Sequence, residues 1–196
     1  MVNDKKRAAT VRQLKDALMQ LFQEYDFQKI TVTMLCRKAG LHRSTFYFYY
    51  SNTDELLREI EHDILNEIQK YSDRMNMFEK PEKGKSLEEI YKKNEQIMID
   101  FYYWQFSMRD YLNPLLGAYG DPYFIIQYEK IIRINTLPAL ELLGYNEKEN
   151  PYVLKYVTGG ILKTNQDWLL NNDISVEEIV HLQRTMVYEN PFVRKG

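Results

Sequence analysis

The stretch AGLHRSTFYFYYSNTDEL, residues 39–56, carries the strongest indication of the fold. It contains five consecutive aromatic residues, 46–50, which cannot all face one hydrophobic core. A polar segment, 42–45, precedes them, and the small residues Ala39 and Gly40 come before that segment. Small residues favour a tight turn, and a helix that follows the turn buries only one of its faces. Some of the rings must therefore face something other than the core.

The residues around this stretch predict three helices in succession. At about 5–25, apolar residues recur at helical spacing, namely Val11, Leu14, Ala17, Leu18, Leu21, Phe22 and Tyr25. A short helix is predicted at about 32–38, with Thr31 as its N-cap and Gly40 closing it in a left-handed conformation. The aromatic run then forms a helix at about 42–49. Two short helices joined by a glycine-containing turn are the outline of a helix-turn-helix.

The remainder of the chain is predicted to be helical as well. Thr53 is expected to cap a helix at about 53–75, and a polar loop at 78–86 marks the joint between two domains. Further helices are expected at about 86–107, 109–117, 122–143, 151–171 and 175–189. Ser175 and Glu178 read as a capping box. With no convincing strand, the predicted fold class is all-α, with about nine helices.

The charge is unevenly distributed. The formal net charge of the 196 residues is only -2, which argues against a protein that coats nucleic acid over its whole surface. Residues 1–50 carry nine Lys or Arg and four Asp or Glu, a net +5, so the rest of the chain carries -7. A basic head on an acidic body predicts a local polyanion-binding face.

Composition excludes several classes of protein. Hydrophobic residues make up 44% of the sequence, enough for a core, so disorder is not expected. The chain has one cysteine, Cys36, and therefore no intrachain disulfide; this thiol is expected to be a small core residue. No apolar run approaches the roughly 20 residues that span a bilayer, and no signal peptide is recognisable. A cytoplasmic protein without a membrane partner is expected.

The helix predicted at 42–49 divides into two faces. Its inner side takes Leu41, Thr45 or Phe46, Tyr49 and Tyr50, and its outer side takes Arg43, Ser44, Tyr47 and Phe48. A guanidinium can bond to guanine in the major groove, and hydroxyls at a helix N-terminus suit phosphate. The aromatic rings can meet thymine methyls or sugars. Two alternatives stay open, because such helix pairs are common in helical proteins and exposed aromatics can form a protein interface.

Residues 7–67 resemble the N-terminal DNA-binding domain of the TetR (tetracycline-repressor) family of transcriptional regulators. The resemblance is carried by LMQLFQEYDFQKITV, AGLHRSTFYFYY and SNTDELL. The family usually shows an alanine-glycine-valine turn, a threonine, an aromatic-x-aromatic patch and a serine-lysine-acid-acid-leucine exit. The resemblance implies a dimeric regulator whose helical C-terminal domain, 76–196 here, serves regulation and dimerisation.

The resemblance also implies roles for single residues. The expected DNA-binding residues are Thr31, Thr33, His42, Arg43, Ser44, Thr45, Tyr47 and Phe48. The two threonines of the first short helix are expected to meet phosphate, and Phe46 and Tyr50 are expected to be core. Two positions depart from the family pattern. His42 stands where a small N-cap residue is usual, and Thr53 stands where a phosphate-binding lysine is usual.

The C-terminal half is rich in aromatic residues. The candidates for a ligand pocket are Phe101, Tyr102, Trp104, Tyr111, Tyr123 and Tyr128. Aromatics at helical spacing are more often bundle core, so the two interpretations stay open. As a set, however, they carry many phenolic hydroxyls that need partners, and this suits a pocket for a small-molecule effector.

The stretch VTGGILKTNQDWLLNND, 157–173, resembles the C-terminal region of a TetR subgroup that includes regulators of dihydroxyacetone kinase operons. The resemblance implies a homodimer interface, for which the candidates are Tyr156, Gly159, Gly160, Lys163 and Trp168. Each glycine inside a helix costs about 1 kcal/mol relative to alanine, so a close helix crossing is a reason for the pair. A loop at the two glycines is the alternative.

An enzyme is not expected, and neither is a cofactor or a metal. The histidines have no metal-ligand spacing, and there is no glycine-rich phosphate loop. The predicted function is a transcriptional repressor that binds a pseudo-palindromic double-stranded DNA operator as a homodimer and senses a small molecule. The alternative is a helical adaptor that binds only protein.

Overall fold

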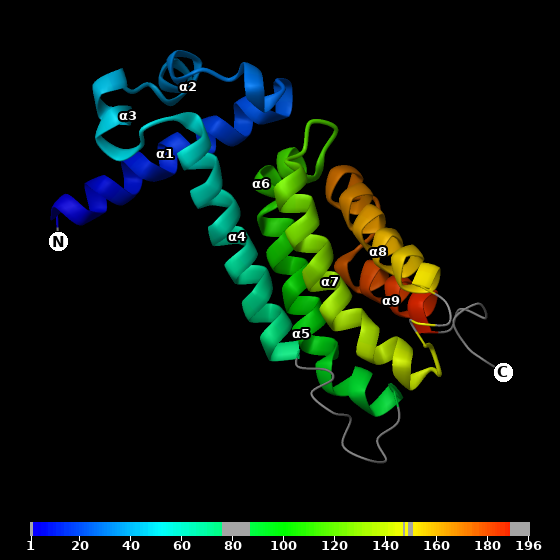
Figure 1. The fold of residues 1–196 in the computed structure, drawn as a ribbon. Helices are drawn as coiled ribbons and strands as arrows, with labels where there is room; N and C mark the ends of the chain where they lie inside the picture. Colours follow the sequence, from blue (N-terminus) through cyan, green and yellow to red (C-terminus); the bar gives the residue numbers. More distant parts are fainter. Residues whose placement is uncertain (1, 76–86, 147, 149–150, 189–196) are drawn as a thin grey trace. The chain divides into compact units, whose positions relative to one another are not determined.

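The computed structural model describes residues 2–75, 87–146, 148 and 151–188, and within these ranges the chain is all-α (Figure 1). The α-helices are α1 (Val2–Glu24), α2 (Val32–Ala39), α3 (Arg43–Tyr49), α4 (Thr53–Met75), α5 (Leu87–Ser107), α6 (Arg109–Leu116), α7 (Pro122–Leu142), α8 (Pro151–Asn171) and α9 (Val176–Tyr188). The predicted fold class is confirmed. The loop predicted at 78–86 and the predicted end of the last helix lie outside the described residues. No helix in the described ranges is long and apolar enough to cross a bilayer.

The chain forms two compact units. The N-terminal unit contains residues up to 66 together with 110–125, and the C-terminal unit contains 67–109 and the residues from 126 onward. The divisions fall inside α4, after the first residue of α6, and inside α7, at positions where the sequence has no glycine or proline to mark them. The predicted domains, 7–67 and 76–196, stay a prediction.

In the N-terminal unit, α1 packs against α2, and α2 packs against α3. The predicted apolar stripe of α1 is largely confirmed, because Leu14, Leu18 and Phe22 are almost completely buried. Tyr25 is a correction: it is 41% exposed, since α1 ends at Glu24 and Tyr25 no longer follows the helical stripe.

The helix ends follow the predicted caps with one exception. Thr31 Oγ1 accepts a hydrogen bond of 3.2 Å from the N–H of Met34, and Gly40 closes α2 with a φ of 66°. The predicted cap at Thr53 is wrong. The N-cap of α4 is Asn52, whose Oδ1 accepts the N–H of Glu55 at 2.8 Å. Asparagine caps a helix at least as well as threonine and stands one residue earlier.

The predicted capping box at the start of α9 is confirmed. Ser175 Oγ accepts the N–H of Glu178 at 3.1 Å, and Glu178 Oε2 accepts the N–H of Ser175 at 2.8 Å. Two N–H groups that the helix itself cannot pair are thereby satisfied.

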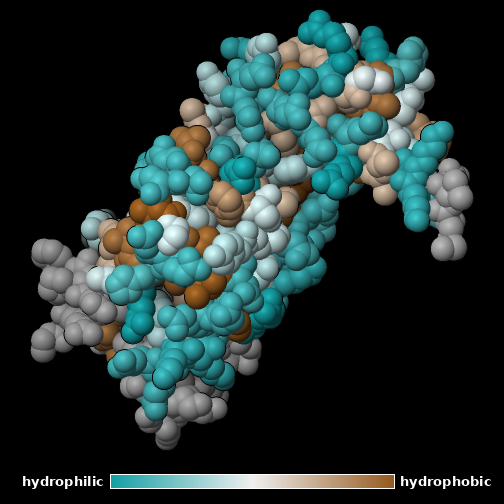
Figure 2. Space-filling model, turned by 180° about the vertical axis from the view of Figure 1, so that it is seen from behind, coloured by the Kyte–Doolittle hydropathy of each residue, from teal (hydrophilic) through white to brown (hydrophobic). Residues whose placement is uncertain are grey.

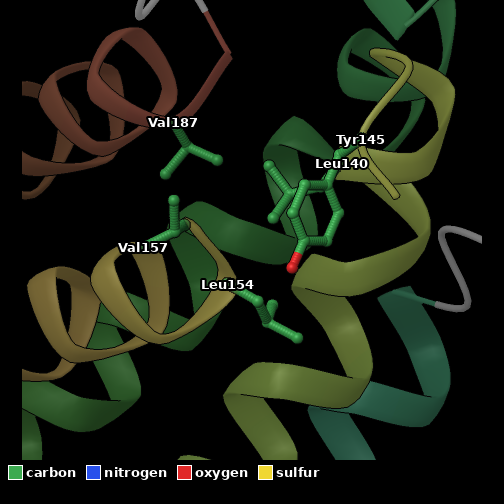
Figure 3. Close-up of a cluster of buried hydrophobic side chains, with 5 residues drawn as sticks. All are labelled: Leu140, Tyr145, Leu154, Val157 and Val187. Carbon is green, nitrogen blue, oxygen red and sulfur yellow. The ribbon is translucent and has the colours of Figure 1, made fainter. Parts of the chain in front are cut away.

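A buried cluster joins three helices of the C-terminal unit (Figure 3). Leu140 belongs to α7, Leu154 and Val157 belong to α8, and Val187 belongs to α9, while Tyr145 follows the end of α7. All five side chains are at most 8% exposed. Their burial fixes the ends of these helices against one another.

Candidate nucleic-acid interface

The aromatic run 46–50 divides between core and surface as predicted. Phe46 and Tyr50 are 0% and 4% exposed, whereas Tyr47 and Phe48 are 51% and 79% exposed. Arg43 and Ser44 are exposed as well. Because residues one helical turn apart share a face, these four exposed residues form one continuous outward surface on α3. We call the four residues, Arg43, Ser44, Tyr47 and Phe48, the outward face of α3.

The end of α3 is held by a carboxylate on α4. Tyr50 donates a hydrogen bond of 3.1 Å to Glu59 Oε1, and Lys15 Nζ lies 2.8 Å from the same oxygen. Lys15 also pairs with Asp63 at 2.6 Å. Burial raises the pKa of the Tyr50 phenol and the charge of Glu59 raises it further, so Tyr50 remains a donor at physiological pH. The end of α3 is therefore bound to α4 through Glu59, and Lys15 links the same carboxylate to α1.

The start of α3 is capped by an imidazole. His42 Nδ1 accepts the N–H of Ser44 at 3.3 Å and lies 2.8 Å from Ser44 Oγ. A ring nitrogen that accepts a hydrogen bond carries no proton, so this cap requires the neutral tautomer with its proton on Nε2. His42 thus takes the structural place of the small N-cap residue that is usual in the family pattern.

The guanidinium of Arg43 is supported by Tyr47. Nη2 lies 3.5 Å from the Tyr47 hydroxyl, and the guanidinium carbon lies 5.9 Å from the ring centroid. The residues are four apart, the spacing at which helical side chains meet. Both side chains remain exposed, so this contact presents a cation and a phenol side by side without burying either of them.

α2 contributes further exposed polar groups. Thr31 and Thr33 are exposed, whereas Thr45 of α3 is half-buried. Arg37 lies one turn beyond Thr33 and is also exposed. Its side chain has no ion pair or hydrogen bond with the part of the chain that is described. Lys38, by contrast, pairs with Glu24 at 3.8 Å. Arg37 was not among the DNA-binding residues predicted from the sequence. Its position four residues after Thr33 places it on the same face of α2 and could have indicated it.

Cys36 has the structural place predicted for it. It is buried on the inner side of α2, and burial raises the pKa of its thiol. A thiol that stays protonated is a poor nucleophile, so the group serves packing.

The aromatic residues predicted for a ligand pocket are found in both units. Phe101, Tyr102 and Tyr128 line a cavity of about 100 Å³ in the C-terminal unit. Trp104 is not part of its lining and stacks on Phe101, with an interplanar angle of 14°.

The other two predicted pocket residues belong to the N-terminal unit and are not part of the lining of this cavity. The hydroxyl of Tyr111 donates to Asp16, and the ring of Tyr123 lies 4.8 Å from the guanidinium of Arg58. The amides Asn135, Asn165 and Gln183, which do line the cavity, were not selected from the sequence. No periodic signal distinguishes a buried amide from an exposed one.

The residues predicted for dimerisation lie mostly on the exposed side of α8. Both glycines of the Gly159-Gly160 pair are helical, so the alternative of a loop is wrong. Tyr156 is 68% exposed, and Lys163 is exposed and pairs with Asp167 at 2.8 Å. Trp168 is a correction. It is only 3% exposed, because it packs inside the C-terminal unit.

Comparisons with known proteins agree with this geometry. Residues 14–60 match the family described as bacterial regulatory proteins, tetR family. A TetR transcriptional regulator from Streptococcus agalactiae 2603V is 22% identical with a TM-score of 0.59, covering 95% of this chain and 98% of that one. The dihydroxyacetone kinase operon activator DhaS is 16% identical with a TM-score of 0.54 and the same coverage. The fatty acid degradation regulator FadR from Bacillus halodurans is 15% identical with a TM-score of 0.61, covering 93% and 96%.

No curated protein matches the sequence. At these identities the solved structures establish the shared fold. The match of residues 14–60 confirms the predicted resemblance to the TetR family over this part of the chain, and with it a helix-turn-helix domain of the kind found in DNA-binding transcriptional regulators.

Proposed function

We propose that this chain, whose residues 14–60 are those of a tetR-family DNA-binding domain, is a cytoplasmic transcriptional repressor and not an enzyme. It binds a pseudo-palindromic operator as a homodimer and responds to a small molecule. The main support for the proposal is the outward face of α3, which exposes a guanidinium, a hydroxyl, a phenol and a phenyl ring. The opposite face of α3 is buried in the protein through Phe46 and Tyr50.

In this proposal α3 lies in the major groove. Arg43 bonds to a guanine, since the fork of a guanidinium matches the two acceptors on that base. Tyr47 and Phe48 meet sugar, backbone and thymine methyls. The threonines Thr31 and Thr33 on α2, together with His42, Ser44 and Thr45, hold phosphate oxygens and set the register.

The exposed side of α8 and α9 supports a second copy of the chain as partner. Hydrophobic residues of these helices are strongly exposed, namely Tyr152, Tyr156, Leu170, Leu182 and Met186. Figure 2 shows hydrophobic side chains gathered on the side of the molecule where α8 and α9 lie. An exposed hydrophobic patch of this kind marks an interface. Gly159 and Gly160 on α8 have no side chain, which allows another helix to approach closely. A twofold dimer uses the same surface on both subunits.

The cavity in the C-terminal unit is the proposed effector site. A ligand that binds one arrangement of the dimer better than another changes the affinity of the dimer for DNA. By thermodynamic linkage, bound DNA changes the affinity for the ligand by the same factor. Repression follows when the unliganded dimer is the tighter DNA binder.

An operator selection from random duplex DNA with the purified protein tests the proposal. The expected result is an enriched, inverted-repeat sequence whose binding weakens steeply with salt, because phosphate contacts release counterions. A helical adaptor that binds only protein would enrich no sequence and shift no duplex. A reporter gene behind the selected operator then gives the sign of regulation, and this matters because one structural neighbour is an operon activator.

A further inference from the structure

The cavity in the C-terminal unit is lined by an unusual set of polar side chains. Ser72, from α4, and Asn135, from α7, stand together: Ser72 Oγ lies 3.1 Å from Asn135 Oδ1 and 2.9 Å from Asn135 Nδ2. Tyr102 from α5, Asn165 from α8 and Gln183 from α9 form a second group. The rest of the lining is chiefly apolar.

The second group is a buried hydrogen-bonded trio. The Tyr102 hydroxyl lies 2.8 Å from Asn165 Oδ1 and also contacts Gln183 Oε1. Gln183 Nε2 lies 2.5 Å from Asn165 Oδ1. The phenol hydrogen can go to Gln183 Oε1 while Gln183 Nε2 donates to Asn165 Oδ1, so both amide oxygens have a donor. Asn165 Nδ2 donates to the Tyr128 hydroxyl at 3.4 Å. Each amide nitrogen carries two hydrogens, and the second hydrogen on each has no acceptor among the described residues, so a bound molecule can use it.

The lining carries no formal charge. Among the described residues around the cavity there is no Asp, Glu, Lys, Arg or His. Burial raises the pKa of both tyrosine phenols that line it beside the amides, Tyr102 and Tyr128, so they stay neutral at physiological pH. An ion placed here would lose its water without gaining an opposite charge, and such a transfer is strongly unfavourable.

The size of the cavity limits the ligand. Its volume is about 100 Å³. An apolar protein cavity of about 150 Å³ binds benzene. The space is smaller than that and therefore suits a molecule somewhat smaller than benzene, with about four to six non-hydrogen atoms, held by the apolar lining on one side and by the amides on the other.

We propose that this cavity binds a small uncharged organic molecule that carries a hydroxyl or amide group, and that it rejects organic anions and cations of the same size. The inference deepens the proposed function, on which it rests, by naming the class of effector. The polar group of the ligand bonds to Asn165 and Gln183, and its apolar part packs near Phe101 and Ile132.

A charge series tests the inference. Isobutanol, isobutyrate and isobutylammonium have nearly the same size and differ in charge. Binding of each to the protein is measured by titration calorimetry at pH 7.5. The expected result is that isobutanol binds and that both ions bind at least tenfold more weakly. Isobutyrate or isobutylammonium binding as tightly as the alcohol overturns the inference, as does the absence of alcohol binding at millimolar concentration.

A charge substitution locates the site. Asn165→Asp keeps the shape of the side chain and adds a negative charge, so the variant is expected to prefer isobutylammonium over isobutanol. Asn171→Asp adds the same charge at an exposed position of the same helix and is expected to leave the preference unchanged. If Asn165→Asp folds and still prefers the alcohol, the proposed contact is wrong. If it does not fold, the series on the native protein decides.

The DNA-binding assay separates this inference from the function on which it rests. A protein that enriches an operator but binds none of the three compounds contradicts only the class of effector. A protein that binds isobutanol but no duplex contradicts the regulatory function and leaves the inference about the cavity intact.

Discussion

Glu61 accepts a hydrogen bond of 2.5 Å from Arg58 Nη1 through one carboxylate oxygen, while its other oxygen, Oε1, is buried without a hydrogen-bond partner among the described residues. Asp121 also faces Arg58, at 3.5 Å. Burial raises the pKa of Glu61 to about 7, although the charge of Arg58 opposes the shift. Two ionised carboxylates have no hydrogen to share with each other, so protonation of Glu61 supplies a carboxyl hydrogen beside Asp121.

The first prediction is a fall in stability between about pH 4.5 and 7 that Glu61→Gln removes. In this window the folded state holds a proton that the unfolded chain, with its ordinary carboxyl pKa of 4.5, releases. Stability therefore decreases as pH rises through the window and is constant above it, a total change on the order of 3 kcal/mol.

Urea unfolding at several pH values measures this change. Glu141→Gln, at an exposed position of α7, is the control and is expected to follow the native curve. Parallel curves for the native protein and Glu61→Gln would contradict the prediction.

Two neighbouring aromatics of α3 are expected to differ in what they serve. Phe46→Ala removes a completely buried ring and is expected to cost about 3–5 kcal/mol of unfolding free energy. Phe48→Ala removes an exposed ring, so it is expected to change stability by no more than about 0.5 kcal/mol but to weaken operator binding. Chemical denaturation and a DNA titration measure the two effects. A large loss of stability in Phe48→Ala would mean that the ring packs against the protein.

Arg43→Ala is expected to weaken operator binding roughly tenfold to a hundredfold and to relax the preference at one base pair of each half-site. The reason is the position of its guanidinium on the first turn of α3, exposed and supported by Tyr47. Binding is measured on the selected operator and on random duplex, with Arg109→Ala in the C-terminal unit as the control. An equal loss of affinity for both duplexes would mean that Arg43 contacts only phosphate.

His42 is expected to stabilise the protein as a helix cap. His42→Ala leaves the N–H of Ser44 without its acceptor and is expected to cost about 1 kcal/mol, whereas His42→Ser, with a hydroxyl in place of the ring nitrogen, restores most of that loss. Thermal and urea unfolding compare the three proteins. If alanine and serine variants are equally stable, the bond to Ser44 contributes nothing to folding.

Gly160→Leu is expected to weaken the homodimer without unfolding the protomer. A Cβ added there meets nothing within 4 Å in the isolated chain, and Gly160 is exposed, so the protomer is expected to tolerate the substitution. A partner helix that crosses at this position does not. Sedimentation at micromolar concentration measures assembly, and circular dichroism checks the helix content. A native protein that is monomeric under these conditions would remove the basis for both the interface and the palindromic operator.

The sequence predicted the helices well because their signals are local. Periodicity located α1 and α4, and the capping box at Ser175 located the start of α9. The errors arose where two local signals compete, or where burial depends on helices that are distant in the sequence. Asn52 and Thr53 are adjacent capping residues, and their order decides which one caps. Trp168 lies on a helix with apolar residues on two sides, and only the packing of the other helices tells which side is buried.

The candidate pocket could be predicted only in part for the same reason. Tyr102 and Tyr128 could be predicted from the aromatic content of this half of the sequence. The cavity also depends on amides from helices distant in sequence, such as Asn165 and Gln183. The separation of Tyr111 and Tyr123 from that cavity follows from the grouping of residues 110–125 with the N-terminal unit, and no local pattern announces it.

The anchoring of α3 has a consequence for how such a regulator can change over evolutionary time. Folding depends on the inner residues Phe46 and Tyr50 and on the bonds of Glu59, whereas the outward face of α3 contacts the rest of the protein very little. Substitutions on that face are therefore nearly free of a folding penalty. A duplicated copy of this chain can drift to a new operator through a few such changes while its scaffold, and its response to an effector, pass on unaltered.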